Sequence, residues 1–135
     1  IEGRCSVVYY EKMSHNLGQS KNFCFKCHRE EDKPTYLQKA TQARVWAVNG
    51  FTFNKQYNTM ASYGSDGAIT TWNHERKSKY TTIKPANGDP ITACDFSADG
   101  SMLCYAVGYD WHKGAEGEKA KQWQTRVFMR TPPLE

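Results

Sequence analysis

The sequence lacks the apolar segments that place proteins in membranes. No apolar run approaches the ~20 residues that a membrane-spanning helix needs. The chain also opens without a signal-peptide pattern, because Glu2 and Arg4 interrupt any apolar stretch there. We therefore expect no membrane insertion.

Residue patterns typical of enzymes are equally absent. No histidine stands beside a Ser or Asp in a triad-like motif; the four are His15, His28, His74 and His112. No Gly-rich loop of the kind that binds phosphate occurs, and turns explain Gly64, Gly67 and Gly100. The sequence therefore predicts a protein without enzymatic activity.

The number of cysteines is odd. Of the five cysteines, Cys94 and Cys104 lie in apolar surroundings typical of small core residues. An odd number of cysteines without a secretory signal is typical of a reducing compartment. The sequence thus favours a protein that works where thiols stay reduced.

The chain is rich in aromatic residues and only mildly basic. Its 135 residues are 39% hydrophobic and 13% aromatic, which is enough for a packed core and argues against an unstructured tail. The formal net charge of +4 permits contact with nucleic acid or an acidic partner but requires neither.

An internal repeat with a period of 43 residues organises the middle of the chain. In this register small residues meet small ones and bulky apolar residues meet each other: Val48 and Ile91, Gly50 and Ala93, Phe53 and Phe96, Met60 and Leu103, Ala61 and Cys104. A polar turn occupies the same place in both copies, at residues 54–58 and 97–101.

Each copy has the composition of strands separated by tight turns. Residues 45–53, 59–63, 68–72 and 79–83 are rich in β-branched and aromatic side chains, and Gly, Asn and Asp separate them. Four strands in about 40–45 residues are typical of one blade of a β-propeller. Helices should be few, because no segment has a convincing helical stripe.

Residues 60–73 resemble a WD repeat. That family places Asp-Gly in a tight turn and a Trp six residues after the Asp, as Asp66, Gly67 and Trp72 stand here. The resemblance implies a buried polar network whose members are His28, Ser62, Asp66 and Trp72. Asn73 stands where the family usually has the Asp of the Trp-Asp pair.

Five short motifs give a more specific resemblance: residues 1–4, 25–29, 47–50, 64–67 and 109–114. In this order they resemble the C-terminal part of nuclear mRNA export factors of the Rae/Gle type. A related spindle-checkpoint propeller, which binds Bub-type kinases, shares the first four motifs. Residues 1–4 also spell an engineered protease site, but Glu2-Gly3 stands where Asp66-Gly67 stands in the next blade, so we interpret them as native.

The resemblance implies an all-β fold, a C-terminal fragment of a WD-repeat β-propeller with roughly two to three four-stranded antiparallel blades. Residues 1–27 would end one blade, with residues 5–10 as a strand. Residues 28–83 would form a complete blade, and residues 84–135 an incomplete last one with a strand at 127–130. A propeller has typically 4–8 blades. We therefore expect the chain to be ordered only with the remaining blades or a substitute partner, because exposed strand edges invite aggregation.

The string Cys24-Phe-Lys-Cys27-His28 has two alternative interpretations. It matches the attachment signature of c-type haem, with His28 and either Met60 or Met102 as axial ligands. Zinc is the other alternative, although a second pair of ligands at sensible spacing is missing. The alternation of residues 23–27 favours a strand with Cys24 and Cys27 on opposite sides, so we expect no metal and no cofactor.

The resemblance implies a binding platform for an acidic GLEBS-type segment of a nucleoporin at the nuclear pore. Arg4 would pair with a carboxylate of that segment. Phe25, Lys26 and Trp72 would line a hydrophobic groove, whereas neighbouring family positions differ in residue type here, at Asn73, His74 and Lys77. Contacts with RNA phosphates would involve Lys77, Lys79, Lys113, Lys119 and Lys121.

The resemblance also implies a location and leaves one alternative partner. The protein would work in the nucleus and at the nuclear envelope, in the nuclear pore complex, and shuttle to the cytoplasm. Bub-type kinases of the spindle checkpoint are the alternative partners. Three polar segments of unassigned purpose are interpreted as loops: residues 13–21, 36–44 and 113–124.

Overall fold

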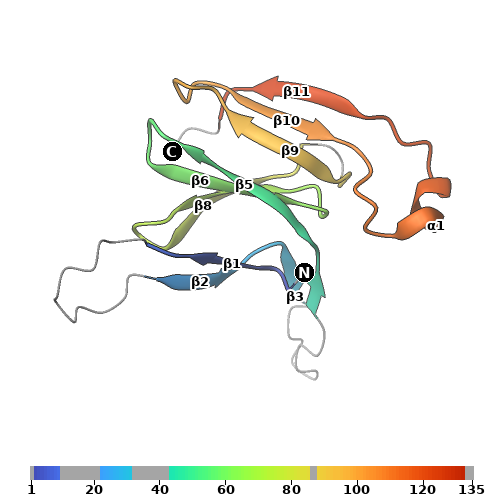
Figure 1. Ribbon diagram of the computed structural model, residues 1–135, viewed down its shortest axis with the longest axis horizontal. Helices are drawn as coiled ribbons and strands as arrows, with labels where there is room; N and C mark the ends of the chain where they lie inside the picture. Colours follow the sequence, from blue (N-terminus) through green and yellow to red (C-terminus); the bar gives the residue numbers. More distant parts are fainter. Residues whose placement is uncertain (1, 10–21, 32–42, 86–87, 133–135) are drawn as a thin grey trace, which may run out of the picture.

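The fold is a set of antiparallel sheets arranged side by side (Figure 1). The computed structural model describes residues 2–9, 22–31, 43–85 and 88–132. Its strands are β1 (Arg4–Val7), β2 (Phe23–Lys26), β3 (Arg29–Glu31), β4 (Ala43–Val45), β5 (Val48–Asn54), β6 (Thr59–Gly64), β7 (Ile69–Asn73), β8 (Ser78–Ile83), β9 (Ile91–Phe96), β10 (Leu103–Val107) and β11 (Arg126–Arg130). A short helix, α1 (Gly114–Lys119), precedes β11. A bilayer-crossing helix is absent from these described residues.

The central sheet has four strands in the order β5-β6-β7-β8. Each strand pairs with the next through a tight connection, in the registers Asn54↔Thr59, Tyr63↔Ile69 and Asn73↔Ser78. Strand β6 is buried at five of its six residues, as expected for a strand covered on both faces. This sheet is one propeller blade, and it confirms the all-β prediction.

A three-stranded sheet, in the order β11-β10-β9, packs against the central one (Figure 1). Strand β9 lies against β5, and the core between the sheets includes Ile69, Ile91 and Leu103, each at most 1% exposed. On the other side of the central sheet lies the two-stranded pair β1-β2. The blade boundaries at residues 27–28 and 83–84 stay predictions.

The 43-residue register holds for the first two strands of each copy and then fails. Val48 begins β5 and Ile91 begins β9, as the repeat requires. Adding 43 to Ile69, where β7 begins, reaches His112, whereas β11 begins at Arg126. The extra residues include α1, so the prediction of a loop over residues 113–124 is wrong in part. Six residues are too few to show a helical stripe in the sequence.

The expected strand at 45–53 is in fact two strands in different sheets. Strand β4 ends at Val45 and pairs with β3, and β5 begins at Val48. The backbone between them has other partners: the Trp46 N–H donates to the His28 carbonyl, and the Ala47 carbonyl accepts from the Ser65 N–H. In this chain the β3-β4 pair therefore lies in sequence between His28 and β5. In the WD pattern, by contrast, the histidine stands directly before the first strand of the blade.

The other predicted boundaries differ by small amounts. Strand β1 ends at Val7 rather than at residue 10, which lies outside the described residues. Strand β7 begins one residue later than predicted, because the Ala68 N–H donates to the Asp66 carboxylate in the preceding turn. The segment 13–21 lies outside the described residues, and of 36–44 only Ala43 and Arg44 are described, in β4.

Candidate functional site

The structure brings His28, Asp66, Ser62 and Trp72 together in one chain of hydrogen bonds. His28 Nδ1 lies 2.8 Å from Asp66 Oδ1, and His28 Nε2 lies 3.0 Å from Ser62 Oγ. The Trp72 indole N–H donates to the same Ser62 oxygen over 3.0 Å. His28 and Ser62 are buried, so each of these polar atoms depends on its partner in the chain.

The direction of the hydrogen bonds follows from the chemistry of the end groups. A carboxylate only accepts, so His28 donates from Nδ1 to Asp66. His28 Nε2 is then the acceptor for the Ser62 hydroxyl, whose oxygen in turn accepts from Trp72. His28 and Ser62 therefore each donate and accept, and Ser62 does both at a single oxygen.

Local backbone geometry makes room for this network. His28 adopts the left-handed conformation, with φ of 48°, which turns the chain between β2 and β3. Gly64 is required nearby, because a Cβ there would lie 2.9 Å from His28 Nδ1 and 2.4 Å from the Ala47 carbonyl oxygen. The imidazole thus fits against β6 only while residue 64 has no side chain.

The predicted groove residues divide between the two faces of the β1-β2 pair. Phe25 faces inward and packs on Trp72, with ring centroids 4.5 Å apart. Arg4 and Lys26 face outward, exposed and directly opposite each other in the strand register. Trp72 touches both a small hollow beside Phe25 and a groove of about 370 Å³ that Lys26 lines. Phe25 is thus a packing partner of the blade network rather than a neighbour of Arg4.

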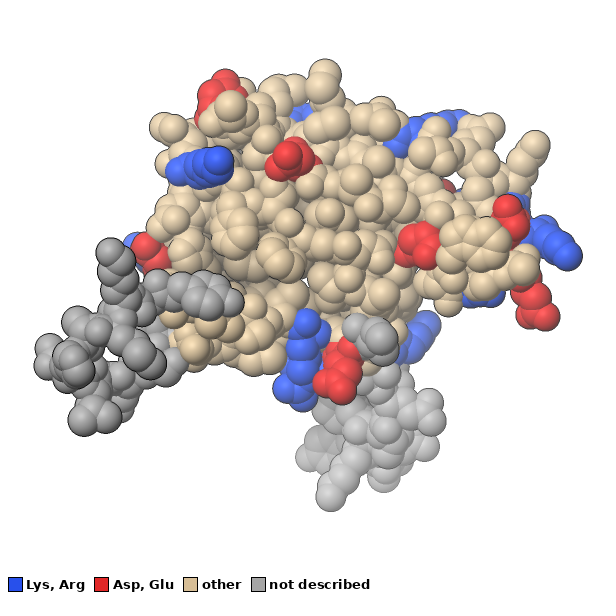
Figure 2. All heavy atoms as spheres, viewed as in Figure 1, with Lys and Arg blue, Asp and Glu red and all other residues tan. Residues whose placement is uncertain are grey.

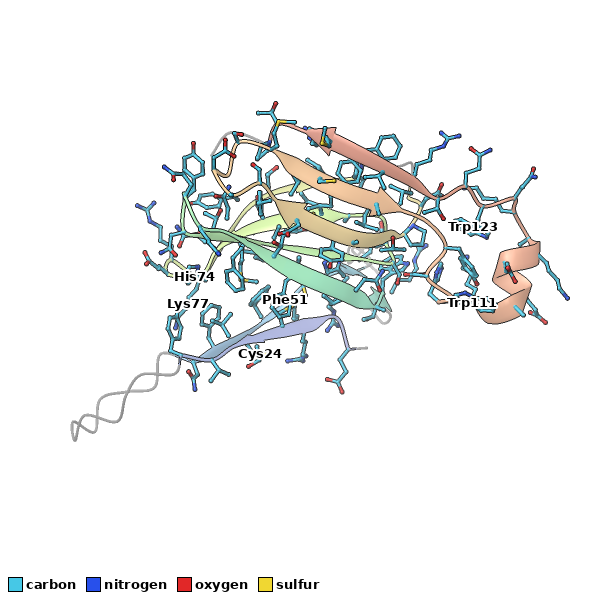
Figure 3. The ribbon with its side chains drawn as sticks, turned by 45° about the horizontal axis from the view of Figure 1, so that its top comes forward. Cys24, Phe51, His74, Lys77, Trp111 and Trp123 are labelled. Carbon is cyan, nitrogen blue, oxygen red and sulfur yellow. The ribbon has the colours of Figure 1, made fainter. Side chains whose placement is uncertain are left out.

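The three positions that depart from the family pattern lie together at the β7-β8 turn. Asn73 donates to the Tyr80 hydroxyl, the His74 ring lies between Tyr9 and Phe53, and the Lys77 ammonium lies 5.0 Å from the centroid of the Phe23 ring. Figure 3 shows His74 and Lys77 beside each other, above the β1-β2 pair. Their side chains thus make contacts within the chain.

The five lysines predicted to contact RNA form two separate groups. Lys77 and Lys79 lie at the start of β8, whereas Lys113, Lys119 and Lys121 lie around α1 at the opposite end (Figure 3). Lys121 donates to Asp89 over 2.5 Å and lies over the Trp123 ring. On the face shown in Figure 2, basic and acidic side chains are interspersed. The lysines therefore do not form one basic stripe.

The structure places Cys24 apart from Cys27 and His28 rather than bringing the three side chains together around one position. Cys24 is exposed on β2, and Cys27 is buried after the strand ends. Both nitrogens of His28 are hydrogen-bonded within the blade network. In the described part of the chain no group of three His, Cys, Asp or Glu side chains is placed to hold a metal ion. The structure gives the haem and zinc alternatives no support.

A second polar cluster, which the sequence did not predict, joins the central sheet to the last one. Asp110 accepts hydrogen bonds from Asn49 at 2.8 Å, Ser65 at 2.5 Å and His112 at 2.6 Å. Thr52 donates to Asp95 in a further contact between the sheets, at 2.6 Å. Asn49 and Asp110 belong to two of the ordered motifs, at residues 47–50 and 109–114. Their presence in these motifs was the one feature of the sequence that could have indicated their contact.

The Asp110 carboxylate has a shifted pKa. Burial alone would raise it, but the hydrogen bonds from Ser65, Asn49 and His112 outweigh burial and hold the pKa of Asp110 below its usual value of 3.8. Ionised Asp110 thus contributes stability that is fully present above pH 3.8 and is lost as pH falls through the lowered pKa.

The chain is similar to mRNA export factors along nearly its whole length. It is 36% identical over 129 residues, 96% of the chain, to the mRNA export factor GLE2 of Chaetomium thermophilum, and it covers 33% of that protein. It is 37% identical over 117 residues, 87% of the chain, to the mRNA export factor rae-1 of Caenorhabditis elegans, of which it covers 29%.

A plant relative gives the same result. The chain is 34% identical over 132 residues, 98% of its length, to Protein RAE1 of Arabidopsis thaliana, of which it covers 33%. The chain thus spans about a third of these curated relatives, and the resemblance to the Rae/Gle type predicted from the ordered motifs is confirmed. No family model matches the chain.

Replacing Ser62 should destabilise the blade. In Ser62→Ala the His28 Nε2 and the Trp72 N–H lose their common partner, which should lower the free energy of unfolding by about 1–3 kcal/mol. Urea unfolding of the whole polypeptide that carries these residues measures the loss. Ser78→Ala, at an exposed position of β8, is the control and should cost little. Equal stability of the two variants would contradict the role of Ser62.

Replacing Asp110 should change the acid sensitivity. Asp110→Asn should lose about 1–3 kcal/mol at pH 7, because the charge-assisted hydrogen bonds weaken. The difference from the parent should shrink as pH falls below 3.8, where the parent's carboxylate becomes protonated. Unfolding curves between pH 7 and 2 test this. Asp99, whose pKa is about 2, also titrates in this range, but it is present in both proteins and its contribution to the pH dependence cancels in the difference. A difference in stability between the two proteins that does not change with pH would contradict the stabilising role of ionised Asp110.

Proposed function

We propose that this chain, related as it is to mRNA export factors of the Rae/Gle type, is part of a non-enzymatic WD-repeat scaffold that acts in mRNA export. It would do so by binding an acidic GLEBS-type segment of a nucleoporin. The whole relatives are about three times as long, so the remaining blades would take part in the binding.

The observation that carries the proposal is the exposure of Arg4 on the outer face of β1, directly opposite Lys26 of β2. The Arg4 side chain thus faces solvent, where a carboxylate of a partner can reach it. The Arg4 guanidinium suits bidentate capture of such a carboxylate.

Reversing the charge of Arg4 tests the proposal. In the whole polypeptide that carries these residues, Arg4→Glu should weaken binding of an acidic GLEBS-type peptide about tenfold or more, because a charge-assisted hydrogen bond is lost and a repulsion is added. Isothermal titration calorimetry measures the affinity. Lys55→Glu makes the same charge change in the exposed β5-β6 turn and is the matched control.

The outcomes separate the two families of partners. If the Arg4→Glu and Lys55→Glu variants bind the peptide with equal affinity, Arg4 does not belong to the interface. A Bub-type kinase segment measured beside the nucleoporin peptide tests the checkpoint alternative, and tighter binding of the kinase segment would replace the export proposal. The location that follows is the nucleus and the nuclear pore, with shuttling to the cytoplasm.

Contact with RNA is the second part of the proposal. Lys113, directly before α1, and Lys119, in its last turn, are exposed. Trp111 lies next to this helix (Figure 3) and is 58% exposed, so it offers an aromatic face to a base. Binding of a single-stranded RNA should weaken steeply between 50 and 200 mM salt, roughly tenfold for each few phosphates contacted. Lys113→Glu with Lys119→Glu should weaken it further, as fluorescence anisotropy would report. Absent or salt-insensitive binding would remove RNA from the proposal.

A further inference from the structure

Two thiols that the proposed function does not use are in contact beside the blade network. Cys5 Sγ on β1 lies 3.5 Å from Cys27 Sγ, just after β2. Both are free thiols; Cys5 is half-buried and Cys27 is 5% exposed. Cys24 is also a free thiol but is exposed on β2 (labelled in Figure 3). The Cys-x-x-Cys string therefore divides into a surface thiol and one that contacts a third cysteine.

Strand register explains why these two sulfurs meet. Cys5 stands opposite Phe25, and the Cys27 N–H donates to the Gly3 carbonyl over 2.9 Å. Cys5 and Cys27 are thus diagonal neighbours across the pair, and their side chains lie on the inward face. Gly3, with φ of 58°, permits this approach, because a Cβ there would lie 2.7 Å from the Cys27 carbonyl oxygen.

The contact makes the two thiols chemically unequal. The hydrogen bond from Cys27 lowers the pKa of Cys5 to about 7, although burial opposes this shift. That hydrogen bond and burial raise the pKa of Cys27. Near neutral pH, Cys5 thus carries much of the thiolate, which is the nucleophilic form of cysteine, and Cys27 keeps its proton.

Small molecules have room to reach Cys5. A groove of about 390 Å³ runs between β1 and β5 and is lined by Cys5, Val7, Phe53 and Met60. By contrast, Cys94 is buried in the core, where burial raises the pKa of its thiol to about 12. Cys5 is therefore better placed than Cys94 to react with a small oxidant.

We propose that Cys5 and Cys27 form an oxidisable pair that hydrogen peroxide converts to a disulfide. The Cys5 thiolate attacks one peroxide oxygen, the O–O bond breaks, and the leaving hydroxide takes a proton to become water. Cys5 is then a sulfenic acid. The Cys27 sulfur attacks the Cys5 sulfur, the S–O bond breaks, and the proton of Cys27 leaves with that hydroxide as a second water. Two thiols and one peroxide thus give one disulfide and two waters.

The disulfide would connect β1 to the residue directly before His28. The sulfurs must approach from 3.5 Å to about 2.05 Å. Diagonal neighbours in a sheet are about 7–8 Å apart, and a disulfide spans at most about 7 Å between Cα atoms, so a small backbone movement must accompany the side-chain rotation. Oxidation would thereby lock the β1-β2 register in place beside the blade network.

Peroxide titration of the whole polypeptide tests the pair. Peptide mapping by mass spectrometry should find a Cys5–Cys27 disulfide with the loss of two hydrogen atoms, which a thiol reductant reverses. Cys24→Ser should form the same disulfide and is the matched control. In Cys27→Ser the reaction should stop at the sulfenic acid of Cys5, which a dimedone label would detect.

Two results would overturn the proposal. One is a Cys5 that reacts no faster than the exposed Cys24, whereas we expect a rate about tenfold higher. The other is a disulfide that joins either cysteine to Cys24 or to a second copy of the chain in place of Cys5–Cys27. Each readout is covalent and therefore independent of peptide binding, so failure here and failure of the proposed function are distinguishable.

Discussion

The Ser62 hydroxyl, which donates to His28 and accepts from Trp72, is the interaction on which the rest of the structure depends. It joins three parts of the chain: the turn after β2, strand β6 and strand β7. Each buried polar atom left without its partner costs about 1–3 kcal/mol, so arrangements that separate these parts are penalised. The network thus selects one position for His28, and with it the position of the β1-β2 pair against the blade.

Both proposals come from the two faces of that single strand pair. Side chains alternate along a strand, so Arg4 and Lys26 point outward, where a partner can reach them. Cys5 and Phe25 point inward, where one meets a second thiol and the other packs on Trp72. A shift of one residue in the pairing would bury the charges and expose the thiols, and the contact of Phe25 with Trp72 opposes such a shift.

Sequence reasoning reached the parts of the structure that short-range patterns determine. The strands of the central sheet follow from β-branched runs between turns, and the network residues follow from the WD spacing. The break between Val45 and Val48 was not predictable in this way, because distant carbonyl and N–H groups of His28 and Ser65 cause it. The contacts of Asp110 with Asn49 and Ser65 and of Cys5 with Cys27 depend equally on how separate strands are placed. Helix α1 was missed because its six residues carry too little pattern.

The hydrogen bonds of Asp110 and Asp95 across the two sheets have a geometric consequence. Apolar packing, as between Ile91 and Ile69, is nearly indifferent to direction, so by itself it would let one sheet rotate on the other. Hydrogen bonds weaken steeply when they are bent, so two contacts three residues apart on β5, at Asn49 and at Thr52, resist such rotation. In a ring of blades, a small error at each junction adds to the next and decides whether the ring closes. These few polar contacts therefore fix the angle between the two neighbouring sheets. The number of blades in a closed ring depends on that angle.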